Sequence, residues 1–207
     1  MRIVVFSPHT DDALFSIGAY LAALDAEISI ASPFAGIPDD DAGRLKHTTL
    51  RQEHGAACAL TGATAVNGDW LDDVYPAPKR TEVSGWLANA MSGYEIAFIP
   101  FGIAHPDHLL TSNLLLDIIR LAPELPQKLY FYEELPYRIN FPELANTRFA
   151  HIENNIGRLR LVEETFPIEP KRQAVLAYRS QTSRNGQVDD SLLSKLLVRE
   201  RIWELVR

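Results

Sequence analysis

Short apolar runs of strand length alternate with longer stretches of helical periodicity through the first part of the chain. The apolar runs are Arg2–Ser7, Glu27–Ala31, Ala63–Val66, Ile96–Pro100 and Lys128–Glu133, and the helical stretches between them are residues 12–25, 45–60, 81–92 and 109–121. This alternation favours a parallel sheet, because a parallel connection needs a crossover long enough to hold a helix. The sequence therefore predicts an α/β fold.

The last part of the chain has a different pattern. Residues 147–166 contain alternating polar and apolar segments around Asn155-Ile156-Gly157, and they predict an antiparallel addition at the edge of the sheet or a small cap. Residues 167–181 and 191–207 are expected to be helical. Because 46% of the 207 residues are hydrophobic, residues 1–207 are expected to form a single domain with a sizeable core.

Composition argues against several classes of partner. A formal net charge of -7 disfavours a nucleic-acid groove or an anionic membrane surface, because both need clustered Lys and Arg. A small molecule is the expected partner. The sequence leaves the oligomeric state undecided between a monomer and a homo-oligomer, because Leu-rich helices can form either the core or a subunit interface. The single cysteine, Cys58, can form no intrachain disulfide, and no secretory signal or membrane span is evident, so we expect a cytoplasmic protein.

Two clusters of histidine and aspartate follow predicted strands. The segment FSPHTDDALFSIG, residues 6–18, follows the first strand, and AHPDH, residues 104–108, follows the fourth. Ligand sites of open parallel sheets lie beyond the carboxyl ends of the strands, where the strand order reverses. We therefore expect the two clusters to meet there. The other histidines, His47, His54 and His151, are assigned no role.

A divalent metal would explain why a histidine and two adjacent aspartates follow a buried strand. His9 and Asp12 from the first cluster and His108 from the second would supply two imidazoles and one carboxylate, with positions open for water and substrate. The cation would also offset the repulsion between the carboxylates of Asp11 and Asp12. We predict a metal site with these three ligands.

The remaining members of the clusters are candidates for the chemistry. Asp11 lies next to a ligand in sequence, and it could accept a proton from a water acidified by the metal. His105 would be a second ionisable group facing the site, and Asp107 could orient it and favour its charged form. The alternative is that Asp11 and Asp12 only cap a helix and that HPDH is a turn in which Pro106 starts one.

The two clusters together resemble the LmbE-like, or PIG-L, family of zinc-dependent N-deacetylases. The first motif of that family is usually HPDD followed by Glu, and its second motif is HPDH. The segments RQEHGAACALTGA, YFYEELPY and KRQAVLAYRSQ are similar to further parts of the family pattern, so the resemblance covers most of residues 1–181. It implies a Rossmann-like three-layer fold with a mostly parallel sheet and a small antiparallel C-terminal addition.

The resemblance also implies roles for individual residues. It implies Asp11 as the general base and His105, supported by Asp107, as the electrophilic or acid group. The implied ligands of Zn²⁺ are His9, Asp12 and His108. Family members typically remove acetyl from N-acetylglucosamine-type amino sugars attached to inositol, malate or other aglycones.

Two positions depart from the family pattern. Thr10 replaces the usual Pro, and its side chain can cap a helix start. Ala13 replaces the usual Glu, which removes a carboxylate beside the ligands. The ligand set survives both changes, and the substrate class is what they leave open.

The candidates for substrate binding are Arg51, Asp72 and Gln181. Arg51 matches the family's arginine on the helix after the second strand and could bind a sugar hydroxyl or an anionic aglycone. Asp72 belongs to an acidic loop that resembles a carbohydrate-contacting rim and also contains Asp69, Trp70, Asp73 and Tyr75. Gln181 could reach the site from its helix. A surface arginine and a solvated acidic loop are the alternatives.

The sequence thus predicts a metal-dependent hydrolase, most simply a zinc N-deacetylase that releases acetate and a free amine from an amino sugar. One alternative is a sugar- or nucleotide-binding module of the same fold without catalysis, although the first turn lacks the Gly-rich fingerprint of a dinucleotide site. Another is a related metal-dependent hydrolase of an ester or phosphoester, which would use the same residues.

Overall fold

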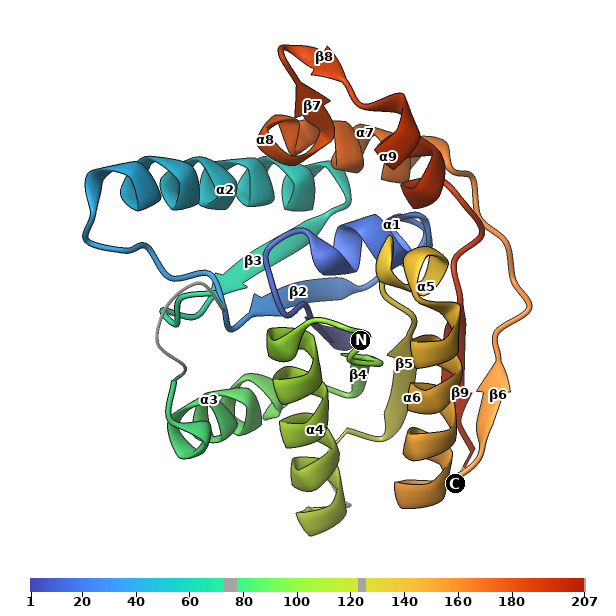
Figure 1. Ribbon diagram of the computed structural model, residues 1–207. Helices are drawn as coiled ribbons and strands as arrows, with labels where there is room; N and C mark the ends of the chain where they lie inside the picture. Colours follow the sequence, from blue (N-terminus) through green and yellow to red (C-terminus); the bar gives the residue numbers. More distant parts are fainter. Residues whose placement is uncertain (73–77, 123–125, 207) are drawn as a thin grey trace.

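A central sheet runs through the molecule, and helices cover both of its faces (Figure 1). The structure is a computed structural model, and it describes residues 1–72, 78–122 and 126–206. Within these residues the sheet has seven strands in the order β3-β2-β1-β4-β5-β9-β6. The strands are β1 (Arg2–Phe6), β2 (Glu27–Ser32), β3 (Ala63–Asn67), β4 (Ile96–Pro100), β5 (Lys128–Tyr132), β6 (Leu159–Leu161) and β9 (Ile202–Leu205).

The first five strands are parallel, and a helix connects each to the next. These helices are α1 (Asp12–Ala22), α2 (Asp41–Leu60), α3 (Arg80–Met91) and α4 (Pro106–Leu121). The predicted α/β fold with a mostly parallel sheet is confirmed, with each of these elements close to its predicted position. Helix α2 begins earlier than predicted because the Asp40 side chain accepts a hydrogen bond from the Gly43 N–H, at 2.8 Å, and caps it.

Alternate strand residues pack against different layers of helices. Ile3 and Val5 of β1 belong to the core shared with α1, α2 and α7 (Glu169–Ala177), whereas Val4 and Phe6 belong to the core shared with α3, α4 and α6 (Pro142–Asn155). The two layers lie on opposite sides of the sheet in Figure 1. Because side chains alternate between the faces of a strand, burial of both faces requires the continuous apolar runs seen in the sequence.

The region after β5 differs from the prediction. We expected alternating strand segments from residue 147, but residues 142–155 form the helix α6. Ala145, Arg148 and Ile152 are its buried residues, and their helical spacing shows that the apparent alternation in RFAHIE belongs to a half-buried helix. The predicted antiparallel addition is present nevertheless, because β6 pairs antiparallel with β9.

The predicted C-terminal helices are also shorter than expected. The helix predicted over 167–181 is divided at Tyr178, whose φ of -81° and ψ of 63° are not helical, into α7 and α8 (Arg179–Thr182). A hairpin of β7 (Ser183–Arg184) and β8 (Gln187–Val188) then precedes α9 (Asp190–Leu196). The predicted helix over 191–207 is wrong in its second half, because residues 202–205 pair with β5 and β6 as a sheet strand.

Helix α1 has a kink, and side chains from later in the sequence form hydrogen bonds with the backbone groups that the kink leaves unpaired. Ile17 has a φ of -133° within the helix. The Glu200 carboxylate accepts hydrogen bonds from the backbone N–H groups of residues 19 and 20, both at 2.9 Å, and the buried Lys171 ammonium donates to the Ser16 carbonyl at 3.2 Å. Lys171 and Glu200 also form an ion pair at 3.2 Å. These contacts replace the lost helical hydrogen bonds and fix the first turn of α1.

None of the helices in the described part of the chain is both long enough and apolar enough to cross a membrane.

Candidate metal centre

The two histidine and aspartate clusters lie at the carboxyl ends of β1 and β4, which are neighbours in the sheet. The chain order reverses between these strands, because β2 and β3 lie on one side of β1 and β4 and β5 on the other. This is the position at which open α/β sheets form a binding crevice. His9 Nδ1 and His108 Nε2, one from each cluster, are 3.2 Å apart, so the predicted meeting of the two clusters is confirmed.

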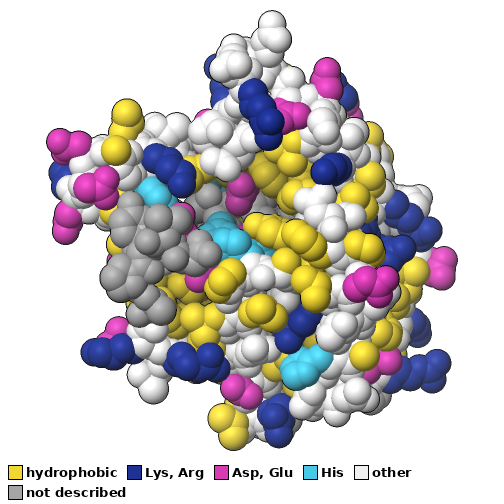
Figure 2. Space-filling model, in the orientation of Figure 1, with side chains coloured by type: hydrophobic (Ala, Val, Ile, Leu, Met, Phe, Trp, Pro, Cys, Tyr) yellow, Lys and Arg dark blue, Asp and Glu magenta, His cyan; other side chains and the backbone are white. Residues whose placement is uncertain are grey.

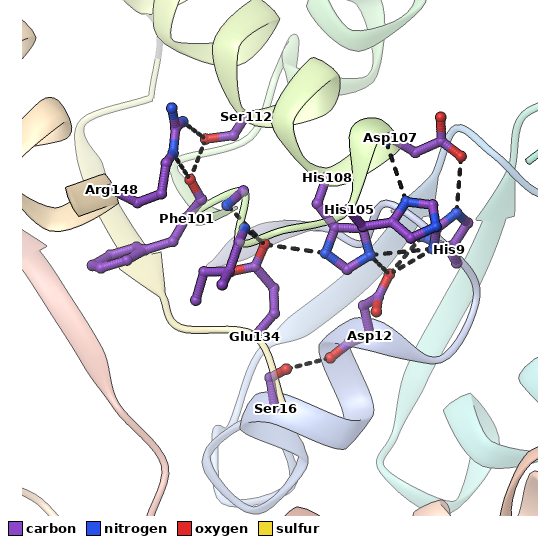
Figure 3. A network of polar contacts seen from close by, with 12 residues as sticks. His9, Asp12, Ser16, Phe101, His105, Asp107, His108, Ser112, Glu134 and Arg148 are labelled. Atoms are coloured by element: carbon purple, nitrogen blue, oxygen red, sulfur yellow. Dashed lines mark hydrogen bonds and ion pairs between the residues drawn. The ribbon is translucent and has the colours of Figure 1, made fainter. Parts of the chain in front are cut away.

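The loop after β4 contains two residues with positive φ angles, a conformation that few residue types adopt. Gly102 has a φ of 82°, and a Cβ there would lie 2.7 Å from the Ser112 Cβ and 2.9 Å from the His108 carbonyl oxygen. Ala104 has a φ of 64°, which is uncommon for a residue with a side chain and often marks a functional loop. The loop places His105 at the N-cap of α4 and His108 in its first turn, with both rings beside His9 (Figure 3).

Three donor atoms form a tight triangle. Asp12 Oδ2 lies 3.3 Å from His9 Nδ1 and 3.0 Å from His108 Nε2, and the two ring nitrogens are 3.2 Å apart. Ligand atoms at about 2.0–2.2 Å from a tetrahedral zinc ion are separated by about 3.3 Å. The predicted ligands therefore already have the mutual spacing that a zinc ion requires.

Each of the two rings presents its other nitrogen to a carboxylate. His9 Nε2 lies 3.0 Å from Asp107 Oδ2, and His108 Nδ1 lies 3.3 Å from Glu134 Oε1 (Figure 3). Carboxylates in this position fix the orientation of metal-binding histidines and raise their basicity. We predicted that Asp107 would orient His105, but its carboxylate contacts His9, and its backbone N–H donates to His105 Nδ1 at 3.3 Å.

Glu134 is a residue of the site that the sequence analysis missed. It is fully buried, and its Oε1 also accepts hydrogen bonds from the backbone N–H groups of Gly102 and Ile103, at 2.7 and 3.1 Å. One carboxylate oxygen thus ties the loop after β4 to the His108 ring. The signal available in the sequence was an acidic residue close behind the buried strand β5, at the same edge of the sheet as the two clusters.

We expect the Glu134→Gln substitution to lower the affinity for zinc by about 10–100-fold, because it removes the negative charge behind His108 while keeping the size of the side chain. Competition with a chromophoric chelator would measure this affinity. Glu133→Gln is the matched control, since Glu133 is also buried but its Oε1 accepts from Trp203 Nε1 instead of contacting a histidine. Equal affinities in the two variants would contradict the role given to Glu134.

The carboxylates raise the pKa values of both rings. Burial acts to lower the pKa of His9, but hydrogen bonds to Asp107 and Asp12 raise it to about 10. Burial acts in the same way on His108, and the charge and hydrogen bond of Asp12 raise its pKa to about 9. Although burial disfavours an ionised carboxylate, His108 and His9 hold the pKa of Asp12 well below its usual range. The site therefore stabilises positive charge in a buried position, as a cation site must.

A second set of candidate metal ligands, made of three histidines, lies at the same site. One nitrogen from each of His9, His105 and His108 lies within 4.8 Å of the others. This set is looser than the triangle that includes Asp12, so it would need a larger rearrangement to bind zinc. His105 belongs to this second set, and it also lines the neighbouring cavity.

The triangle of donor atoms lies beside a cavity of about 320 Å³. Figure 2 shows histidine side chains in a hollow on this face, next to a group of hydrophobic side chains. Predicted site residues that line the cavity are His9, Asp11, Asp12, Arg51, Asp72, His105 and Gln181. Burial raises the pKa of Asp11 to about 6, and the charge of Asp12 adds to the rise. The structure thus brings the candidate base, acid and substrate-binding residues to one cavity.

Arg51 has contacts that the sequence did not suggest. Its Nε donates to the Ala35 carbonyl, and its Nη2 donates to the Gly68 carbonyl and to Asp69 Oδ1, both at 2.9 Å. Arg51 therefore joins the loop after β2 to the loop after β3 and shapes the rim of the cavity. Asp73 and Tyr75, which we included in the predicted rim, lie outside the described residues.

Two further lining residues come from α2. Lys46 and His47, the latter assigned no role from the sequence, both line the cavity near Asp72, with His47 Nε2 3.8 Å from Asp72 Oδ2. His47, Leu50 and Arg51 share one face of α2 by their spacing. This periodicity could have identified His47 once Arg51 was selected.

The two departures from the family pattern have different surroundings. The carbonyl of Thr10 accepts a hydrogen bond from the Tyr178 hydroxyl at 2.7 Å, and His54 Nδ1 lies 2.9 Å from that hydroxyl. Since the hydroxyl proton goes to the carbonyl, His54 Nδ1 carries the proton of the second bond. His54 thus contacts the Tyr178 hydroxyl, and none of its hydrogen bonds within the described residues reaches the donor triangle. Ala13 is fully buried in the core that includes α1 and α7.

Comparison with known proteins gives structural matches. A scan against protein-family models finds no match, and a search of curated proteins finds none either. A triple mutant of the deacetylase Orf2 of the teicoplanin biosynthetic pathway matches with a TM-score of 0.74 and 22% identity, over 100% of this chain and 98% of that chain. A zinc-inhibited form of Orf2 also matches.

Other matches extend the range of activities. N,N'-diacetylchitobiose deacetylase from Pyrococcus horikoshii has a TM-score of 0.58 and 18% identity, over 89% of this chain and 72% of that chain. The 4-carboxy-2-hydroxymuconate hydratase GalB from Pseudomonas putida has a TM-score of 0.65 and 17% identity, over 94% of this chain and 82% of that chain. The chain therefore has the fold that these deacetylases share with this hydratase.

Proposed function

We propose that the protein is a zinc-dependent N-deacetylase of the LmbE-like type, which hydrolyses the acetamide of an N-acetylglucosamine-type amino sugar to acetate and a free amine. The observation that carries this proposal is the triangle of donor atoms from His9, Asp12 and His108 beside a cavity that Asp11 also lines. The similar structures of two deacetylases, one of them acting on N,N'-diacetylchitobiose, support it.

Zinc at the triangle would polarise the acetamide carbonyl and acidify the attacking water. Asp11, in the cavity wall next to Asp12, would accept the proton of that water and pass it to the leaving amine. His105 would donate a hydrogen bond to the developing oxyanion. Because its Nδ1 accepts from the Asp107 N–H, the neutral ring carries its proton on Nε2. The Asp107 carboxylate would hold His9 in its orientation.

The cavity suits a small polar ligand with one apolar face. Its volume of about 320 Å³ is at the lower end of ligand-binding clefts, and its wall includes Phe15 and Phe34. Asp72 and Gln181 would bind sugar hydroxyls, and Arg51 would contribute from the rim. We also place the reaction in the cytoplasm, since the single cysteine, Cys58, is a buried free thiol, as expected in a reducing compartment.

The test is the release of acetate from N-acetylglucosaminides by zinc-loaded protein, compared with chelated protein and with chelated protein that has been given zinc again. We expect activity that is lost on chelation and restored by zinc. The same sugar with an O-acetyl group, the sugar phosphate and an unsaturated carboxylic acid complete the panel, because a hydratase shares the fold. Faster turnover of any of these three, or binding of N-acetyl sugars without turnover by zinc-loaded protein, would overturn the proposal.

A further inference from the structure

A second cavity, which we call the arginine cavity, lies beside the segment that joins β5 to α5 (Tyr137–Asn140). It has a volume of about 600 Å³, and residues of α6, β6 and β9, which are neighbours in Figure 1, contribute to its wall. Its polar and aromatic lining residues include Glu133, Arg138, Asn146, Arg199, Arg201 and Trp203. Neighbouring residues face different sites here, since Glu133 lines the arginine cavity whereas Glu134 contacts His108.

Arg138 is a buried cation whose donors are only partly used. Only 7% of the residue is exposed. Its Nη2 donates to the Arg199 carbonyl at 2.7 Å, whereas Nε and Nη1 have no hydrogen-bond partner among the described residues. Native proteins rarely leave buried donors unpaired, and the cost is higher for a charged group. Both nitrogens are shielded from solvent, so Arg138 contributes a buried and only partly paired positive charge to the wall of the cavity.

Glu133 pairs with Arg138 by charge but does not hydrogen-bond to it. Its Oε1 accepts a hydrogen bond from Trp203 Nε1 at 2.9 Å. Its Oε2 lies 3.5 Å from Arg201 Nη1 and 3.9 Å from Arg138 Nε, and it too has no hydrogen-bond partner. Both distances exceed the usual length of a hydrogen bond. The Glu133 carboxylate therefore forms an ion pair with each arginine but a hydrogen bond with neither.

The charges around the cavity are unbalanced. Three guanidinium groups, from Arg138, Arg199 and Arg201, face one carboxylate, that of Glu133, which leaves an excess of two positive charges. A further carboxylate near Arg138, that of Glu200, is already engaged by the backbone N–H groups of residues 19 and 20.

We propose that the arginine cavity binds a phosphate group, either free or carried by a small phosphorylated molecule. A phosphate monoester brings a charge of about -1.5 to -2 and three strong acceptor oxygens, and this charge matches the excess positive charge around the cavity. The planar fork of arginine pairs with two phosphate oxygens at once, so the exposed side chains of Arg199 and Arg201 can both bind one phosphate. The volume of the cavity leaves room for an organic part beside the phosphate.

The test is calorimetric titration of the zinc-loaded protein with inorganic phosphate, with glucose 6-phosphate and with glucose. We expect saturable binding of one or both phosphates and none of glucose. Arg201→Gln and Arg199→Gln, at exposed side chains that tolerate change, should each weaken binding by about tenfold or more. The matched control is Arg172→Gln, an exposed arginine of α7 outside the cavity, which should bind as the wild type does.

Phosphate could also bind at the metal centre, and the variants separate the two locations. Binding that disappears on chelation of zinc and is unchanged in Arg201→Gln would place the phosphate on the metal and overturn the proposal. Absence of binding by either phosphate would also overturn it. The measurement needs no turnover, so its outcome is independent of whether the protein is a deacetylase.

Discussion

The His108→Ala variant is expected to lose stoichiometric zinc and, with it, hydrolytic activity. His108 is fully buried, and its Nε2 is one corner of the donor triangle, so no other described side chain can take its place without a rearrangement. The loss should exceed the about 10–100-fold effect that is typical of residues that only support a ligand. Elemental analysis of the purified protein after zinc loading measures the metal, and acetate release measures the activity.

Removal of a buried histidine can also destabilise a protein, so this prediction needs a matched control. His54 is equally buried, and it bonds to Tyr178 instead of facing the donor triangle. We expect His54→Ala to lower the thermal midpoint while keeping about one zinc per chain, and His9→Ala, at a partly exposed ring, to lose zinc in a folded protein. Full zinc occupancy in both His108→Ala and His9→Ala would contradict the proposed ligand set.

The Asp11→Asn variant is expected to keep its zinc and to lose about 10²–10⁴-fold in kcat, which is the usual contribution of a general base. The amide is nearly the same size as the carboxylate but cannot accept the proton of the attacking water. KM should change little, because the substitution leaves the cavity and the ligands in place. Acetate release at saturating substrate, together with zinc content, gives both quantities.

Asp25→Asn, at an exposed aspartate just after the end of α1, is the control for a change of one charge near the same helix. It should leave kcat as in the wild type. If Asp11→Asn retained wild-type kcat, the carboxylate would have no part in proton transfer, and the base would have to be sought among the other lining residues.

The elements of the parallel sheet could be predicted because their signals are local. Among the first five strands, the buried ones are apolar on both faces. The helices between them carry apolar residues at helical spacing, so the sequence of each element shows which of its faces are buried. The same reasoning failed at residues 147–155, where a half-buried helix of mixed composition produced an apparent alternation. It failed again at residues 202–205, where pairing with β5 and β6 decided the conformation.

The candidate site also has features that the sequence predicts and features that it does not. The two loops and their candidate ligands could be selected from the sequence, because histidine and aspartate have little reason to cluster after buried strands unless they bind something. The contact of Asp107 with His9 and the role of Glu134 were not evident. Asp107 and His9 are 98 positions apart, and no local pattern records which ring a distant carboxylate will reach.

The sequence by itself therefore determined the order of strands and helices in the parallel part of the sheet, together with the candidate metal ligands. Only the tertiary structure decided which nitrogen of each histidine ring faces the donor triangle and which carboxylate contacts the other nitrogen. It also decided that three arginines line a second cavity. The physical reason is that periodicity reports whether a residue is buried, whereas its partner depends on the packing of elements far apart in the chain.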